Sequence, residues 1–322
     1  MTWRPALSRS ALLRHDPVRE ADLLIVPERI GWRPVFLINL PAGVVLLVLG
    51  RRVLENSRTE ERVRLDPAGV AVLTVAMTAF TVPLIFGRDH GWPAWAWISL
   101  ACGAALLVGF VRHESRARHP LLDLAAVRPE GVKPGLVACW IIMGCYTAFL
   151  FTLTLHLQST LRFSPLQAGL AFVPYAVGFG TLSLTWNRYP RRLQNALPVM
   201  GPIMFATGAV LLVLLHRDQW HPYGSVPLLL LAGAGHAAGY SPLIARITSL
   251  VQPRLASAIS ALNSTGPTLA GVTAVAGLGS VYFAAPTSAE GLLRVVFAVA
   301  ALLAIGTACA TRVALLFNRL QE

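Results

Sequence analysis

The sequence predicts an all-α, polytopic membrane protein with about nine transmembrane helices. Only 13% of its 322 residues are charged and 55% are hydrophobic, whereas a soluble protein carries roughly a quarter charged residues. The mean hydropathy is +0.60. Apolar runs of about 20 residues, the length that crosses a bilayer core, alternate with short basic segments. These observations exclude an ordinary soluble domain.

The chain opens on a basic tail, residues 1–33, which lacks an apolar run long enough for a span or a signal peptide. Each of the apolar segments that follow offers roughly 20 mostly apolar residues. Backbone amides in lipid must bond within their own segment, so we expect helices. The predicted spans are 34–54, 66–87, 94–111, 134–157, 165–186, 196–215, 225–248, 257–283 and 291–316.

The longest break between spans, residues 112–133, divides the chain into a three-helix part, 34–111, and a six-helix bundle, 134–322. Loops rich in Arg and Lys stay in the cytoplasm. With the 112–133 loop inside, 17 of the 27 basic residues fall in cytoplasmic loops and 4 on the opposite side, the other 6 being in the tail. We therefore expect a multi-pass protein of the bacterial inner membrane with a cytoplasmic C-terminus.

The N-terminal tail conflicts with this topology. Nine spans that end in the cytoplasm place the tail and its six arginines outside, and short basic segments resist export. Either the first span does not insert as predicted, or helices that normally precede it are missing from the chain. Missing helices are the favoured explanation.

The net charge of +12 does not predict a nucleic-acid partner, because the basic residues lie in short clusters between spans without interleaved aromatic residues. Membrane lipids are the expected surroundings. The cysteines all lie in apolar runs without CxxC spacing, which predicts neither a disulfide framework nor a metal site. They are Cys102, Cys139, Cys145 and Cys309.

Several segments, in order and at matching spacing, resemble the fourteen-helix drug:proton antiporter branch of the major facilitator superfamily. They are 31–41 (GWRPVFLINLP), 65–69 (LDPAG), 91–92 (GW), 114–122 (ESRARHPLL), 155–158 (LHLQ) and 163–170 (FSPLQAGL) with Pro174. The resemblance implies a partial major facilitator fold in which the nine spans are helices six to fourteen. Two departures stand out. His156 replaces a usual Tyr, and Asn263 is followed by Ser-Thr-Gly-Pro in place of a usual Arg-Gln pair.

The resemblance also implies export of a small amphipathic or cationic substrate, driven by the proton gradient, with no cofactor and no enzymatic activity. Coupling protons to transport calls for a titratable group in the membrane. No Asp or Glu lies deep in a predicted span. By resemblance, the coupling carboxylates belong to the first helices of the family. We therefore expect the chain to be truncated and inactive alone, and possible partners include a separate N-terminal half.

The remaining candidates for the substrate pathway are Asn39, His156, Gln158, His236 and Asn263. His156 can change charge near neutral pH, although a hydrogen-bonded histidine at the membrane interface is the simpler interpretation. His236 could bind substrate or relay protons, or it could simply lie among small residues that let helices pack closely. Asn263 is expected to hydrogen-bond between helices.

The predicted cytoplasmic loops carry a further motif, made of Glu114, Arg116, Pro120, Arg188, Arg191 and Arg192. A topology signal is a sufficient explanation for its arginines. Arg246, near a helix end, is expected to extend its charge to the membrane surface as an anchor.

Two other functions remain open at the level of sequence. The chain could be a non-transporting membrane subunit. It could also be a membrane-embedded transferase, for which the only polar cluster is His113, Glu114, His119 and Asp123.

Overall fold

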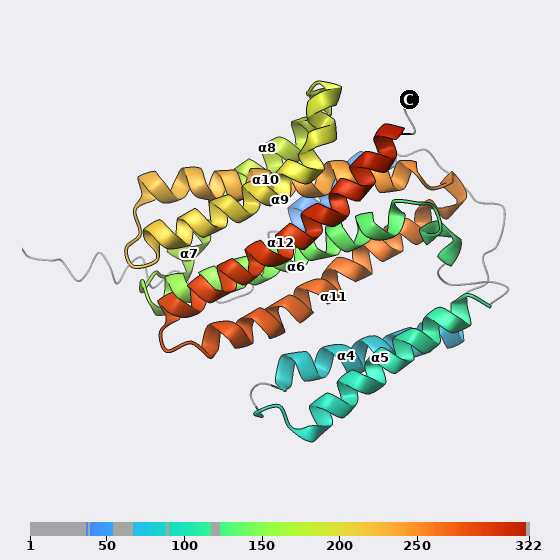
Figure 1. The fold of residues 1–322 in the computed structure, drawn as a ribbon, viewed down its shortest axis with the longest axis horizontal. Coiled ribbons are helices and arrows are strands. Elements are labelled where there is room, and N and C mark those ends of the chain that lie inside the picture. The colour runs from blue at the N-terminus through green and yellow to red at the C-terminus, as the bar shows by residue number, and fades with distance from the viewer. Residues whose placement is uncertain (1–36, 38, 54–66, 88–89, 117–122, 320–322) are drawn as a thin grey trace, which may run out of the picture. The chain divides into compact units, whose positions relative to one another are not determined.

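The computed structural model describes residues 37, 39–53, 67–87, 90–116 and 123–319 (Figure 1). The chain divides into two units, Met1–Arg62 and Val63–Glu322. In the first unit, helix α3 spans Asn39–Val53, which is 15 residues of the first predicted span. Apart from Leu37, the rest of that span lies outside the described residues, as does the whole basic tail, 1–33.

The second unit is built from helices throughout its described residues. Its α-helices and short 3-10 helices are α4 (Pro67–Phe86), α5 (Ala94–Glu114), η1 (Leu124–Val127), α6 (Val132–Ser159), α7 (Pro165–Ala171), α8 (Val173–Thr185), η2 (Trp186–Arg188), α9 (Arg191–His216), α10 (Pro222–Ser249), η3 (Pro253–Leu255), α11 (Ala256–Phe283) and α12 (Ser288–Arg319).

The all-α membrane fold predicted from sequence is confirmed. Among the described residues, eight helical segments are long and apolar enough to cross a membrane. Each corresponds to one predicted span from 66–87 onward, with ends that differ by a few residues.

Two details of the helices were not predicted from the sequence. The expected single helix over 165–186 is broken at Phe172 into α7 and α8. Ser164 starts α7 with a reciprocal cap, in which its hydroxyl accepts from the Gln167 backbone and the Gln167 side chain accepts from the Ser164 backbone. The predicted loop 112–133 is also partly helical, because α5 continues to Glu114, η1 forms within it and α6 begins at Val132.

Helices α6 and α10 form the interior of the bundle and are buried along much of their length. Helix α10 packs on α8 and α9, whereas α11 and α12 pack on α6 (Figure 1). One large cluster of buried side chains, including Phe149 and Phe205, fills the space between these helices. A second cluster lies around the start of α6 and includes Leu136 and Ile247. Helices α4 and α5 pair with each other.

Glycines set how closely α10 approaches its neighbours. A Cβ atom added to Gly233 would lie 2.0 Å from the carbonyl oxygen of Tyr175 on α8, and one added to Gly201 on α9 would lie 2.1 Å from the backbone nitrogen of Gly239. A Cβ atom at either position would overlap a backbone atom of the neighbouring helix, so only glycine fits there. The small residues of α10 therefore act as close-packing positions, as one of the two interpretations of this segment predicted.

We expect Gly233→Ala to destabilise the bundle by about 1–3 kcal/mol, because the added methyl group collides with a backbone that cannot move alone. Thermal unfolding of the purified chain in detergent measures this change. Gly180→Ala is the matched control, since an added Cβ there meets nothing within 4 Å. Equal melting temperatures for the two variants would contradict the close-packing role.

Candidate functional site

His236 lies in the interior of the bundle, with only 2% of its surface exposed. Its Nδ1 lies 3.0 Å from the hydroxyl oxygen of Tyr175 on α8, and its Nε2 lies 3.3 Å from the sulfur of Met143 on α6. The rings of Tyr146 and Phe179 have centroids 4.6 and 4.7 Å from the imidazole centroid. The side chain therefore joins three helices through polar and aromatic contacts.

These contacts favour a structural role for His236 over direct substrate contact. Both ring nitrogens have neighbours within hydrogen-bonding range, and aromatic rings cover the imidazole. A buried polar group that is satisfied in this way fixes the relative positions of its helices. His236 does not line the apolar groove between α4, α6, α11 and α12.

His156 is also buried, at the end of α6, where its Nε2 donates to the carbonyl oxygen of Arg217, 2.6 Å away. Arg217 is the C-cap residue of α9, so this bond ties the ends of two helices together. Gln158, two residues further on, is exposed. His156 is therefore a hydrogen-bonded histidine at a helix end, as the simpler interpretation of the sequence predicted. Gln158 takes no part in this contact.

Asn263 on α11 accepts a hydrogen bond from the hydroxyl of Tyr240 on α10, at 3.2 Å. This is the interhelical bond expected from the sequence. Asn39 begins α3, and its side chain lies outside the described residues. Of the candidates in the second unit, His156, His236 and Asn263 make separate hydrogen bonds, and Gln158 is exposed.

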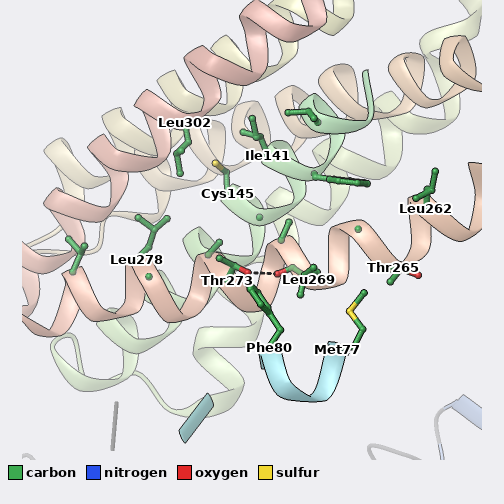
Figure 2. Close-up of a pocket in the computed structure, with 18 residues that line it drawn as sticks. Met77, Phe80, Ile141, Cys145, Leu262, Thr265, Leu269, Thr273, Leu278 and Leu302 are labelled. Carbon is green, nitrogen blue, oxygen red and sulfur yellow. Dashed lines mark hydrogen bonds between the residues drawn. The ribbon is translucent and has the colours of Figure 1, made fainter. Parts of the chain in front are cut away.

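An apolar groove of about 660 Å³ lies between α4, α6, α11 and α12. Figure 2 shows Met77 and Phe80 of α4 opposite Leu269 of α11, with Ile141 of α6 and Leu302 of α12 further in. No charged side chain is present among the residues that line it. Such a concave, mostly apolar surface with few polar groups is typical of small-molecule sites.

The groove offers few hydrogen-bonding groups. The Thr273 hydroxyl donates to the Leu269 carbonyl one turn earlier, at 2.8 Å, and is therefore used within α11 (Figure 2). Thr265 is exposed at the groove. Trp140 of α6 also lines it, and its indole N–H is buried without an acceptor among the described residues. A ligand would therefore bind chiefly through shape, apolar contact and aromatic faces.

The loop motif is dispersed. Glu114 is buried at the end of α5, Arg116 is exposed, and Pro120 lies outside the described residues. Arg188 lies in η2, and Arg191 and Arg192 begin α9. All three side chains are exposed. Helix α9 therefore begins before the predicted span 196–215 and includes Arg191 and Arg192.

Arg246 differs from its sequence-based interpretation. Its side chain is not extended to solvent, because only 7% of the residue is exposed. Its Nη2 donates to the Gln194 carbonyl oxygen and to Asn195 Oδ1, both at 2.8 Å. The residue thus clamps α10 onto the first turn of α9. The position of Arg246 near a helix end suggested a membrane anchor. Nothing in the sequence indicated that it would bond to Asn195 and Gln194, which are 51 and 52 residues away.

Comparison with known proteins identifies the family. Residues 23–275 match the family described as Major Facilitator Superfamily. The chain belongs to the major facilitator superfamily. The fold-class prediction of a partial major facilitator architecture is thereby confirmed.

Curated relatives of this major facilitator chain are named for export. It is 31% identical over 265 residues to a Streptomyces coelicolor protein named "Probable actinorhodin transporter", covering 79% of the chain and 45% of the relative. It is 31% identical over 263 residues to the drug efflux pump JefA of Mycobacterium tuberculosis, covering 80% and 51%. It is 34% identical over 248 residues to the cephamycin export protein CmcT of Amycolatopsis lactamdurans, covering 75% and 51%. The chain spans about half the length of these relatives.

We expect Tyr175→Phe to lower the stability of this major facilitator bundle by about 0.5–1.5 kcal/mol, the usual net value of one buried hydrogen bond. The variant removes only the hydroxyl that faces His236 Nδ1. Unfolding in detergent with increasing denaturant measures the loss. Tyr223→Phe is the control, because Tyr223 is 97% exposed. An unchanged midpoint for Tyr175→Phe would show that the contact contributes nothing.

Proposed function

We propose that this chain is the C-terminal part, helices six to fourteen, of a fourteen-helix drug exporter. The proposal is supported by the order of the motifs from residue 31 to Pro174. The eight apolar spans and the export functions in the names of the relatives also support it. The observation that carries it is the apolar groove, since a drug exporter needs a membrane-depth surface that accepts apolar molecules of varied shape.

The proposed substrate is a small amphipathic or cationic compound. The groove volume of about 660 Å³ is within the range for drug-sized ligands. The aromatic faces of Phe80 and Trp140 line it, and such faces attract organic cations more strongly when water is excluded. Because Met77 is flexible and polarisable, it can adapt to different substrates.

The proposed mechanism is alternating access, in which two helical halves rock around a site near the middle of the membrane. Helices α6 to α12 form one half. The described carboxylates of this chain, Glu114, Asp123, Glu130, Asp218 and Glu290, lie at helix ends or in loops. We propose that proton coupling depends on the helices that make up the N-terminal half, whether these belong to the same polypeptide or to a partner.

Groove binding can be tested on the chain by itself. We expect Thr265→Trp to weaken binding of radiolabelled tetraphenylphosphonium at least about fivefold, because the indole occupies the groove and removes about 1 kcal/mol or more of contact. Scintillation proximity with protein purified in detergent gives the dissociation constant. Thr181→Trp on the exposed face of α8 is the matched control, since Thr181 does not line the groove. Equal weakening in both variants would contradict the assignment.

Transport provides a separate test. We expect vesicles that contain only this 322-residue chain to show no tetraphenylphosphonium flux above that of empty vesicles when a pH gradient is imposed. The reason is that alternating access needs two halves. Vesicles with a complete relative such as JefA report whether the assay works. Proton-driven flux by the chain alone would refute the proposed division between halves while leaving the groove assignment intact.

A further inference from the structure

A hollow of about 390 Å³, the hydroxyl hollow, adjoins the apolar groove between α4 and α11. The two spaces share the lining residues Met77, Thr265 and Leu269, so a single molecule can extend from one into the other (Figure 2). No charged residue is among those described as lining the hydroxyl hollow. Four hydroxyl side chains line it, and they are Thr81, Ser264, Thr265 and Thr268.

Helical spacing brings these hydroxyl groups together. Ser264 and Thr268 are one turn apart on α11, with Thr265 beside them, so all three lie on the face of the helix that lines the hollow. Thr81 lies opposite, one turn after Met77 on α4. Ser264 and Thr265 directly follow Asn263, in the segment where the sequence departs from the usual pattern of the fourteen-helix antiporters.

The hydrogen bonds within α11 decide what the hydroxyl hollow can offer a ligand. Ser264 Oγ donates to the carbonyl oxygen of Ser260, and Thr268 Oγ1 donates to the carbonyl oxygen of Ser264, both at 2.9 Å. A hydroxyl group has one proton and two lone pairs. Because both protons are used within the helix, Ser264 and Thr268 present their lone pairs, and they act on a ligand as acceptors.

This arrangement selects the polar end of a ligand. A polar group without a partner is costly away from water, and a hydrogen bond is electrostatically stronger there. An N–H or O–H group gains an acceptor from Ser264 or Thr268, whereas a carbonyl or ether oxygen gains no donor from either residue. The lining therefore distinguishes ligands by the direction of their hydrogen bonds and not by their charge.

We propose that the hydroxyl hollow binds the hydrogen-bond-donating end of a substrate, an amino or hydroxyl group, while the apolar body of the same molecule occupies the adjoining groove. The preferred substrate is thus an amphipathic compound whose polar end donates hydrogen bonds. This inference rests on the proposed export function, because it specifies which substrates the groove accepts.

Two dyes with the same ring system test the inference. Proflavine carries two amino groups, and acridine orange is the analogue in which both are dimethylated and have no N–H donor. Both dyes are monocations at neutral pH. Displacement of radiolabelled tetraphenylphosphonium from the purified chain gives an inhibition constant for each dye.

We expect Thr268→Val to weaken proflavine binding about fivefold, the usual effect of losing one hydrogen bond. Binding of acridine orange and of tetraphenylphosphonium, which place no N–H group in the hollow, should change less than twofold. Valine has nearly the shape of threonine, and Thr268 is exposed, so this variant should fold. Ser264→Ala should act in the same direction.

Thr307→Val on α12 is the matched control, because the Thr307 hydroxyl also donates within its own helix, at 2.8 Å, and lines neither space. Equal effects of Thr268→Val on the two dyes, or failure of proflavine to displace tetraphenylphosphonium, would overturn the inference and leave the groove in place. A selective loss of proflavine binding in Thr273→Val alone would also overturn it, since Thr273 lines only the groove. Absence of tetraphenylphosphonium binding to the unaltered chain would instead refute the groove and the proposed function with it.

Discussion

The close approach of α10 to α8 and α9 is the constraint on which the rest of the bundle depends. In a membrane, lipid tails are as apolar as the helix surfaces, so association relies on van der Waals contact and on interhelical hydrogen bonds. Gly233 meets the backbone of Tyr175, and Gly201 meets that of Gly239. Larger residues at these positions would separate the helices and weaken every contact that α10 makes.

The polar residues of α10 follow from that approach. Within three turns, His236 reaches α8 and α6, Tyr240 reaches α11, and Arg246 reaches α9. Together these bonds join α10 to four neighbouring helices, so α10 holds α6, α8, α9 and α11 in their relative positions. A rigid half of this kind suits a transporter whose two halves move as bodies. Helix α11 is mostly exposed along its span, and its exposed surface lines the apolar groove.

Sequence reasoning predicted the spans well because a bilayer imposes a length and a polarity that can be read locally. It also predicted the Tyr240–Asn263 type of bond, since a buried amide in a span has few alternatives. It could not predict the surroundings of His236, whose neighbours come from three helices. It misjudged Arg246, because a basic residue near a helix end is usually an anchor and its partners lie far away in sequence. The groove leaves no linear pattern at all, since its lining comes from four helices.

The placement of charged lining residues follows the polarity of the membrane itself. A charged side chain is costly at the bilayer centre and much less so near the headgroups. The apolar groove, lined along the length of α11 from Leu262 to Val281, accordingly contains no charged lining residue. A cavity lined by Arg191 and Arg246 lies instead at the end of α10, where a charge is expected to be less costly than in the middle of a span.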